Sequence, residues 1–380
     1  MAELFSGIGG FTARLNRNIF RVRFALDMDA IANSVYKNFN PFTKVITEDI
    51  QNVGNFKSLG KSPDIVLAGP PCQGFSLVGM KTKKELSSMK NYNSNSDPRN
   101  FLPLEAVRVS EQLRPKILII ENVPAMNTQI VSYRGQDIPL VHILRNMLGE
   151  AGYSVTEPFL LEASKLGIPQ RRKRSFVIAS LFAKIKPSEI ISAQDRIFQV
   201  SGIKDVDHAI RDIEAIPMMS KRSNEVPVFP DHIGRVPNQD DIRIIQNLRP
   251  GENYNTLLKR KPEVILDRKH KVYSTSSFAD KFYRLRWDKP SRAIVAHLQK
   301  DGNSFIHPSL NRPISVREAA RIQSFPDSFY FGIAMSPAYR LIGNAVPPLM
   351  GQFIVETVSR IVGLSNEKQA VESSFASLIN

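Results

Sequence analysis

Only one cysteine, Cys72, occurs among the 380 residues of the chain. A single thiol excludes a disulfide framework within the chain and a zinc site built from several thiolates, and we expect no metal site. Long apolar runs are also absent, so the sequence predicts a globular protein without membrane-spanning segments. The first residues, MAELFSGIGG, lack the basic leader and the longer apolar block of a secretory signal. These absences predict a cytoplasmic protein.

Acidic residues are too few to balance the basic ones, and the formal net charge is +15. Twelve Lys and Arg stand against four Asp and Glu between Lys259 and Lys300, and RRKR at 171–174 forms a second cluster. This uneven distribution suits contacts with the phosphates of a nucleic acid along a groove. Two solvated basic faces without such a partner would give the same counts.

Short apolar segments alternate with amphipathic helical stretches in the first half of the chain. The expected strands are AELF (2–5), VRFAL (22–26), KVI (44–46), DIVLA (64–68), KILII (116–120) and SFVIA (175–179). The alternation predicts an α/β fold with a doubly wound, mostly parallel sheet that helices cover on both faces. Ligands bind such sheets beyond the carboxyl ends of the strands. The features that follow strand ends here are FSGIGG, Asp27, Asp49, PPCQ and Glu121.

The pattern becomes irregular and charged after about Leu181 and regular again after about Pro313. We therefore expect a smaller domain, residues 183–312, inserted into a catalytic domain formed by residues 1–182 and 313–380. VREAARIQSF predicts a helix, and the prolines at 347 and 348 predict the start of a long one. The polar residues from Ser365 onward are expected to fray.

Three glycines in FSGIGG, Gly7, Gly9 and Gly10, follow the first expected strand and would let backbone approach a cofactor closely. A tight turn without a ligand would use similar glycines. Asp27, at the end of the second strand, is suited to accept hydrogen bonds from ribose hydroxyls. Together these residues indicate a cofactor that contains a ribose, either a nicotinamide nucleotide or S-adenosylmethionine.

Cys72 lies in GPPCQGFS, a proline-flanked loop after the expected strand at 64–68. A thiol held there is placed for nucleophilic attack, although a lone cysteine is often a small buried apolar residue. Glu121, in ENVP, ends another strand at the same edge, where a carboxyl kept protonated by burial could donate to a ring nitrogen. Glu121 could equally cap a helix or form an ion pair.

These residues belong to a series of motifs that resembles the DNA cytosine-5 methyltransferases of bacterial restriction-modification systems. The motifs are, in order, FSGIGG, DMD, EDI, GPPCQGFS, ENV, PQRRKR, REAARIQSFPD and GNAVPP. They cover nearly the whole chain, and the basic insert takes the place of the family's target recognition domain. The resemblance implies the fold of an S-adenosylmethionine-dependent methyltransferase and methyl transfer to C5 of cytosine in a specific duplex DNA sequence.

The resemblance also implies a mechanism. The Cys72 thiolate adds to C6 of cytosine while Glu121 hydrogen-bonds or protonates N3, which makes C5 electron-rich enough to accept the methyl group. Because C6 is inaccessible in a stacked duplex, the base must flip out of the helix. Arg172 and Arg174 match the arginines that hold the flipped cytosine and the active-site loop, and Arg174 is the expected contact to the base carbonyl.

Residues of other motifs are expected to bind the cofactor and the DNA. Those expected at S-adenosylmethionine, or its product S-adenosylhomocysteine, are Phe5, Gly7, Ile8, Gly9, Gly10, Asp27, Met28, Asp49, Ile50, Pro70, Leu102, Asn344 and Ala345. Those expected at the DNA are Gln73, Ser76, Arg99, His297, Gln299 and Lys300. Phe5 would pack on the adenine, Asp49 and Ile50 would contact its edge, and Asn344 would lie near the methionine end.

Two positions depart from the family's pattern. The acidic motif often has Trp in its middle, where this chain has Met28, whose softer thioether surface would still pack on the adenine. The recognition domain often has Thr before an apolar residue, where this chain has Ala293 before Ile294. The second departure leaves the recognition loops, including HLQKDGN at 297–303, less defined than the catalytic motifs.

Three other functions stay open. An RNA-directed member of the same family would carry a Cys-Phe-Thr segment, which is absent, and would lack so large a basic insert. A nicotinamide-dependent oxidoreductase explains the glycines and Asp27 but gives PPCQ and ENV no role. A non-catalytic DNA-binding regulator explains the charge but does not need Cys72.

We expect a monomer that associates with the nucleoid through DNA, accompanied by a restriction endonuclease of the same sequence unless the enzyme is an orphan or phage-borne. The polar segment 79–100 is expected to close over the flipped base when DNA binds, and an ordinary surface loop is the alternative. The target sequence is not readable, because specificity depends on a few side chains that meet base edges.

Overall fold

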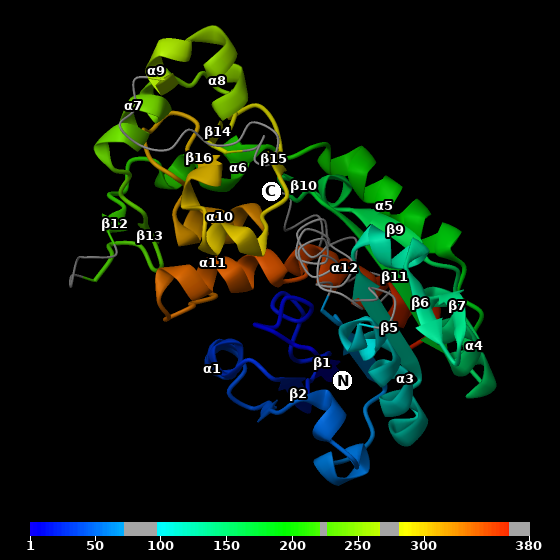
Figure 1. The fold of residues 1–380 in the computed structure, drawn as a ribbon. Coiled ribbons are helices and arrows are strands. Elements are labelled where there is room, and N and C mark those ends of the chain that lie inside the picture. Colours follow the sequence, from blue (N-terminus) through cyan, green and yellow to red (C-terminus); the bar gives the residue numbers. More distant parts are fainter. Residues whose placement is uncertain (72–96, 221–225, 267–280, 365–380) are drawn as a thin grey trace. The chain divides into compact units, whose positions relative to one another are not determined.

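The computed structural model describes residues 1–71, 97–220, 226–266 and 281–364 (Figure 1). Most of segment 79–100, which is expected to close over the flipped base, lies outside these ranges, as do the residues from Ser365 onward. The chain packs into two compact units. The first unit comprises Met1–Leu166, Lys173–Ser201 and Pro348–Asn380, and the second comprises Gly167–Arg172 and Gly202–Pro347. These are units of packing, so the functional division at 183 and 312 stays a prediction.

A central sheet organises the first unit. Its strands are β1 (Ala2–Leu4), β2 (Phe24–Asp27), β3 (Lys44–Thr47), β4 (Ile65–Ala68), β5 (Ile117–Asn122), β8 (Ser154–Val155), β9 (Phe159–Glu162) and β11 (Lys173–Ser180). Their order is β3-β2-β1-β4-β5-β11-β8, and β9 also pairs with β11. The strands from β3 to β5 pair in parallel, with Leu4 beside both Leu26 and Ala68. The expected α/β class with a mostly parallel sheet is confirmed.

Apolar residues at alternate strand positions build the core on one face of this sheet. Leu4, Leu26 and Leu118 are almost fully buried there, against α3 (Leu102–Leu113) and α4 (Leu140–Glu150). The buried residues of both helices recur at helical spacing, so each helix presents one apolar stripe to the sheet. Figure 1 shows α3 beside β5 and α4 next to α3. Burying each large aliphatic side chain contributes about 1.5–3 kcal/mol to stability.

Three further helices belong to the first unit: α1 (Ala30–Phe39), α5 (Pro187–Ser201) and α12 (Pro348–Ile361). Helix α1 begins after Asp29, whose carboxylate accepts hydrogen bonds from the backbone N–H groups of Ile31 and Ala32. Helix α12 begins at a proline, as the sequence predicts.

Strand direction was not predictable from the local pattern. The segment SFVIA lies in β11, which runs antiparallel to β5, β8 and β9. An antiparallel hairpin of β6 (Ile130–Tyr133) and β7 (Gln136–Pro139) was also not expected. A strand that is buried on both faces has the same apolar composition in either direction, so periodicity alone does not distinguish the two cases.

The second unit is built from short elements. Its helices are α6 (Val206–Ile210), α7 (Gln239–Asn247), α8 (Tyr254–Arg260), α9 (Pro262–Leu266), α10 (Val316–Ile322) and α11 (Met335–Asn344). Its strand pairs are β10 (Gln170–Arg171) with β15 (Ser291–Arg292), β12 (Met219–Ser220) with β13 (Ile233–Gly234), and β14 (Tyr283–Arg284) with β16 (Phe305–Ile306). Helix α10 confirms the helix predicted for VREAARIQSF.

Buried arginines satisfy many loop carbonyls in the second unit. Arg284 donates to the carbonyl oxygens of His307 and Ile245, at 3.0 and 2.6 Å. Arg317 donates to those of Pro230 and Phe329, at 3.0 and 2.9 Å. Because short strands leave many backbone groups outside ladders, planar guanidinium groups provide the missing donors. Among the described residues, no helix combines the length and apolar character needed to cross a membrane.

Candidate active site

Glu121 and Arg174 form an ion pair at the carboxyl end of β5. Arg174 Nε lies 2.8 Å from Glu121 Oε1, and the two side chains are only 15% and 10% exposed. The pairing of β11 with β5 places Phe176 opposite Glu121, and Arg174 lies on the same face as Phe176 by strand periodicity. Because both side chains are largely buried, water screens the attraction between them only weakly. Two residues expected to be catalytic are therefore in direct contact.

The backbone that leads toward Cys72 is held beside this pair. Asn122 Nδ2 donates to the carbonyl oxygen of Pro70 at 3.2 Å, and the N–H of Gly69 donates to that of Leu4 at 3.3 Å. A Cβ on Gly69 would lie 3.8 Å from Glu121 Oε2. Strands β1 and β5 thus hold the backbone at Gly69 and Pro70, where the PPCQ loop begins. Cys72 itself, and the expected DNA-binding residues Gln73 and Ser76, lie outside the described residues.

Asp27 shapes the glycine loop that follows β1. The N–H of Gly7 donates to Asp27 Oδ2 and the N–H of Asp29 donates to Oδ1, each at 2.8 Å. Asp27 therefore ties the end of β2 to the glycine loop and to the start of α1. Gly9 has φ +83°, and a Cβ there would lie 2.9 Å from Tyr36 Cε2, so this position requires glycine.

The residues expected at the adenine come from several segments of the first unit. Phe5, Ile50 and Leu102 border the same apolar core. Met28 is 70% exposed, which leaves its thioether available to a bound ring. Asp49 caps a 3₁₀ helix that begins at Ile50. An apolar surface, a carboxylate at the end of β2 and a tight glycine loop together fit a nucleoside cofactor.

Glu3 is a buried acidic residue that sequence reasoning missed. Its Oε2 accepts hydrogen bonds from Thr12 Oγ1 and Tyr36 OH, both at 2.9 Å. Burial raises the pKa of Glu3 to about 7. These bonds tie β1 to the turn after the glycine loop and to α1. Ile8 and Gly10, both expected at the cofactor, are buried residues. A charged residue within the apolar strand AELF was the signal available in the sequence.

Arg172 belongs to the second unit and contacts protein carbonyls. Its Nη1 donates to the carbonyl oxygen of Ile294 at 2.6 Å, and Nη2 donates to those of Gly343 and Ala345 at 3.0 and 3.1 Å. The residue is only 2% exposed. The side chain therefore joins the PQRRKR, AIV and GNAV segments of this unit, and these contacts differ from the expected contacts with a flipped base.

Helix α11 packs against the 3₁₀ helix Ala296–Gln299, and Asn344 and Ala345 lie at the C-terminal end of α11. A Cβ on Gly343 would lie 2.2 Å from the backbone nitrogen of Ala296, so only glycine allows this approach. Asn344 is the last residue of α11 and is exposed. Its side chain is therefore accessible to a ligand.

The expected recognition residues near 297–300 lie on and after a 3₁₀ helix, Ala296–Gln299. Leu298 is buried and anchors this helix, whereas His297 and Gln299 are half-buried and Lys300 is exposed. Arg235 donates to the carbonyl oxygens of Gln299 and Lys300 and so fixes the backbone. The segment offers polar side chains on a rigid support.

Arg99 lies in the first unit and binds Asp97. Its Nε donates to Asp97 Oδ1 at 3.0 Å and its Nη2 to Oδ2 at 2.7 Å. Arg99 is 45% exposed at its side chain. A DNA phosphate would therefore have to compete with, or share the guanidinium with, this carboxylate.

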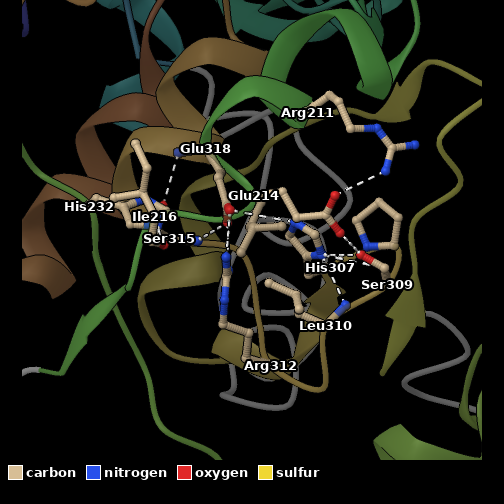
Figure 2. Close-up of polar contacts among 12 residues, drawn as sticks. Arg211, Glu214, Ile216, His232, His307, Ser309, Leu310, Arg312, Ser315 and Glu318 are labelled. Atoms are coloured by element: carbon tan, nitrogen blue, oxygen red, sulfur yellow. Dashed lines mark hydrogen bonds and ion pairs between the residues drawn. The ribbon is translucent and has the colours of Figure 1, made fainter. Parts of the chain in front are cut away.

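A buried polar cluster in the second unit was not expected (Figure 2). His307 Nδ1 accepts a hydrogen bond from the N–H of Leu310 at 3.1 Å, and its Nε2 lies 3.6 Å from Glu318 Oε1. Arg312 donates to both oxygens of Glu318, at 2.8 and 2.7 Å. Burial lowers the pKa of His307 to about 4, so the ring is neutral near pH 7. The cluster holds the loop after β16 against α10.

Most of the chain matches one protein family. The model of the family described as C-5 cytosine-specific DNA methylase matches residues 1–360. The chain belongs to this family, and it is an S-adenosylmethionine-dependent DNA (cytosine-5) methyltransferase.

Individual relatives agree with this assignment. The chain is 30% identical to the type II methyltransferase M.DdeI of Desulfomicrobium norvegicum, over all of this chain and 94% of the relative. It is 28% identical to the type II methyltransferase M.AgeI of Thalassovita gelatinovora, over 94% and 98%. A solved structure of a putative DNA modification methyltransferase from an E. coli prophage matches with TM-score 0.68 and 21% identity, over 95% and 99%. That structural likeness shows the fold.

Proposed function

We propose that the enzyme methylates C5 of a cytosine flipped out of a specific duplex sequence, through a covalent bond between Cys72 and C6. The observation that carries this proposal is the Glu121–Arg174 ion pair beside the Gly69–Pro70 backbone. Cys72 follows Pro70 by two residues in the sequence, and Pro70 follows β4, the strand next to β5. A nucleophile and a group that binds the pyrimidine edge are the two functions that this chemistry requires.

The Cys72 thiolate forms a C–S bond with C6, and the displaced π electrons make C5 nucleophilic while Glu121, protonated when the base binds, donates its proton to N3. S-adenosylmethionine, when bound, supplies the electrophilic methyl group. A base then removes the C5 proton, the electron pair left behind expels the thiolate, and N3 returns its proton to Glu121, which restores the ring. A guanidinium has five N–H donors, so Arg174 can bind the base carbonyl while it holds Glu121.

The cofactor would be held mainly by the first unit. Asp27 would accept from the ribose, Phe5 and Met28 would pack on the adenine, and Asp49 would contact its edge. Asn344 would bind near the methionine end. DNA would be bound by the segment around His297–Lys300 and by Arg99, and the net charge of +15 favours such a polyanion.

The relatives named above are type II methyltransferases, which supports a role in restriction-modification. We infer a cytoplasmic enzyme that acts as a monomer on chromosomal DNA. A restriction endonuclease of the same specificity would be its companion, since C5 methylation protects a site from cleavage.

Transfer of tritium from labelled S-adenosylmethionine tests the function. We expect label in unmethylated plasmid DNA at C5 of cytosine, and bisulfite sequencing of DNA from an expressing host should then identify the target sequence. Label in transfer RNA, with none in plasmid DNA, would contradict the proposal.

A further inference from the structure

Two buried glutamines of the second unit, Gln170 and Gln323, have no role in the chemistry described above. Both are 0% exposed. Gln170 Nε2 donates to Gln323 Oε1 at 2.6 Å, although the two residues are 153 positions apart in the chain. Buried amides are costly unless each polar atom has a partner, so a pair in direct contact is a specific arrangement.

The outer ends of this pair bind two separate backbone segments. The N–H of Ile294 donates to Gln170 Oε1 at 3.0 Å, and Gln323 Nε2 donates to the carbonyl oxygen of Ala345 at 2.8 Å. Donors and acceptors therefore run in one direction, from the N–H of Ile294 through both amides to Ala345. Hydrogen bonds aligned in this way polarise one another and strengthen the chain.

Each end of the chain of hydrogen bonds leads to a proposed binding segment. Ile294 precedes the 3₁₀ helix that carries His297 and Gln299, and Ala345 adjoins Asn344. Further contacts join the same two segments: Arg172 binds carbonyls of both, and Gly343 lies against the Val295–Ala296 backbone. The two segments are thus held as one packed body within this unit.

We propose that Gln170 and Gln323 are positioning residues that couple DNA binding by the 294–300 segment to cofactor binding at Asn344 and Ala345. The inference rests on the proposed function of these two segments. Because close packing leaves the amides no room to adjust separately, a displacement of Ile294 is passed on to Ala345. The coupling acts in both directions, so the cofactor equally strengthens DNA binding.

The test compares the Kd of S-adenosylhomocysteine with and without a duplex that carries the sequence identified by bisulfite sequencing. In the native enzyme we expect the duplex to lower this Kd at least about 5-fold. In Gln323→Met, which keeps the volume but loses both amide functions, the ratio should fall to within about 2-fold of unity. In Gln323→Glu the ratio should be low at pH 8 and recover at lower pH, where a protonated carboxyl again donates to Ala345.

The matched control is Gln194→Met, since Gln194 is also buried and donates to the carbonyl oxygen of Glu162 at 3.1 Å, but lies on α5 in the first unit. In this variant the duplex should lower the Kd of S-adenosylhomocysteine by the same factor as in the native enzyme. If Gln323→Met does not fold, Gln170→Glu replaces it, because an oxygen facing Gln323 Oε1 breaks the same link. A native ratio in the folded Gln323 or Gln170 variant overturns the inference. If the duplex does not lower the Kd of S-adenosylhomocysteine in a native enzyme that methylates DNA, the inference is also overturned. If the native enzyme does not methylate DNA, the proposed function itself is contradicted.

Discussion

Arg174 Nε lies 2.8 Å from Glu121 Oε1, across two adjacent antiparallel strands. Strand pairing therefore brings the two side chains within reach of each other. A carboxylate that is oriented before the base arrives needs little reorganisation during the reaction, which is the usual advantage of a preorganised electrostatic site.

Arg174→Lys should reduce kcat/KM for DNA because an ammonium group cannot orient Glu121 and bind the base carbonyl at once. Loss of one charge-assisted hydrogen bond costs about 2–3 kcal/mol, or roughly 30–150-fold in rate. Initial rates of methyl transfer at several DNA concentrations give the measurement. Arg171→Lys is the matched control, since Arg171 is exposed on β10; equal losses in both variants would contradict a specific role.

Asp27→Asn should weaken the binding of S-adenosylhomocysteine. The amide keeps the shape of the side chain. Its NH₂ group, however, faces one of the two backbone N–H groups that donate to the Asp27 carboxylate, so one of these hydrogen bonds is lost. We expect Kd to rise roughly 10–150-fold, for about 1.5–3 kcal/mol, in isothermal titration calorimetry. Asp29→Asn should change Kd little, because Asn is an equally good helix N-cap. An unchanged Kd in Asp27→Asn would refute the ribose contact.

Lys300→Ala should reduce DNA affinity without changing cofactor affinity. If six phosphates are neutralised, affinity should fall about a thousandfold between 50 and 200 mM salt, and the variant should lower the slope by about one contact. Fluorescence anisotropy over a salt series measures both quantities. Lys61→Ala is the control, because Lys61 is exposed and precedes β4, at the strand end opposite the carboxyl edge. A native salt slope in Lys300→Ala would place the interface elsewhere.

The neutral state of His307 predicts a loss of stability in mild acid. Burial lowers its pKa to about 4 in the folded protein, against 6.5 for an ordinary histidine. Between these values the unfolded chain binds more protons, so this contribution is present above pH 6.5 and is lost as the pH falls toward 4. From pH 7 to pH 5 the loss is roughly 2 kcal/mol.

Urea titrations at the two pH values measure this loss. His307→Gln should show less dependence on pH, while His208→Gln, which replaces an exposed histidine of α6, should behave like the native protein. Equal pH dependence in native protein and His307→Gln would show that other groups are responsible.

The sheet was largely predictable because each strand is a local pattern. The strands β1 to β5 lie where apolar runs such as DIVLA and KILII predicted them. The antiparallel direction of β11 was not predictable, since neither its composition nor its length encodes direction. The adjacency of Glu121 and Arg174 depends on that pairing, so the resemblance supplied both residues but not their contact.

The second unit was harder to predict, because its stability depends on contacts between distant residues. Its strands are two residues long, too short to produce a periodic signal. In the sequence, Gln170 and Gln323 are two polar residues of the motifs PQRRKR and RIQSF. Their hydrogen bond joins positions 153 residues apart, which no local pattern indicates. Similarly, Arg172 was expected at the substrate from its motif, whereas its carbonyl contacts depend on where three loops meet.

A duplex that carries 5-fluorocytosine at the target position tests the covalent mechanism most directly. Fluorine at C5 cannot leave as a proton, so the adduct between Cys72 and C6 cannot be resolved. We predict a protein–DNA complex that survives denaturing electrophoresis, requires S-adenosylmethionine, and is absent with Cys72→Ser. Cys72→Ser protein that still traps DNA, or that methylates it at a rate close to native, would contradict Cys72 as the nucleophile.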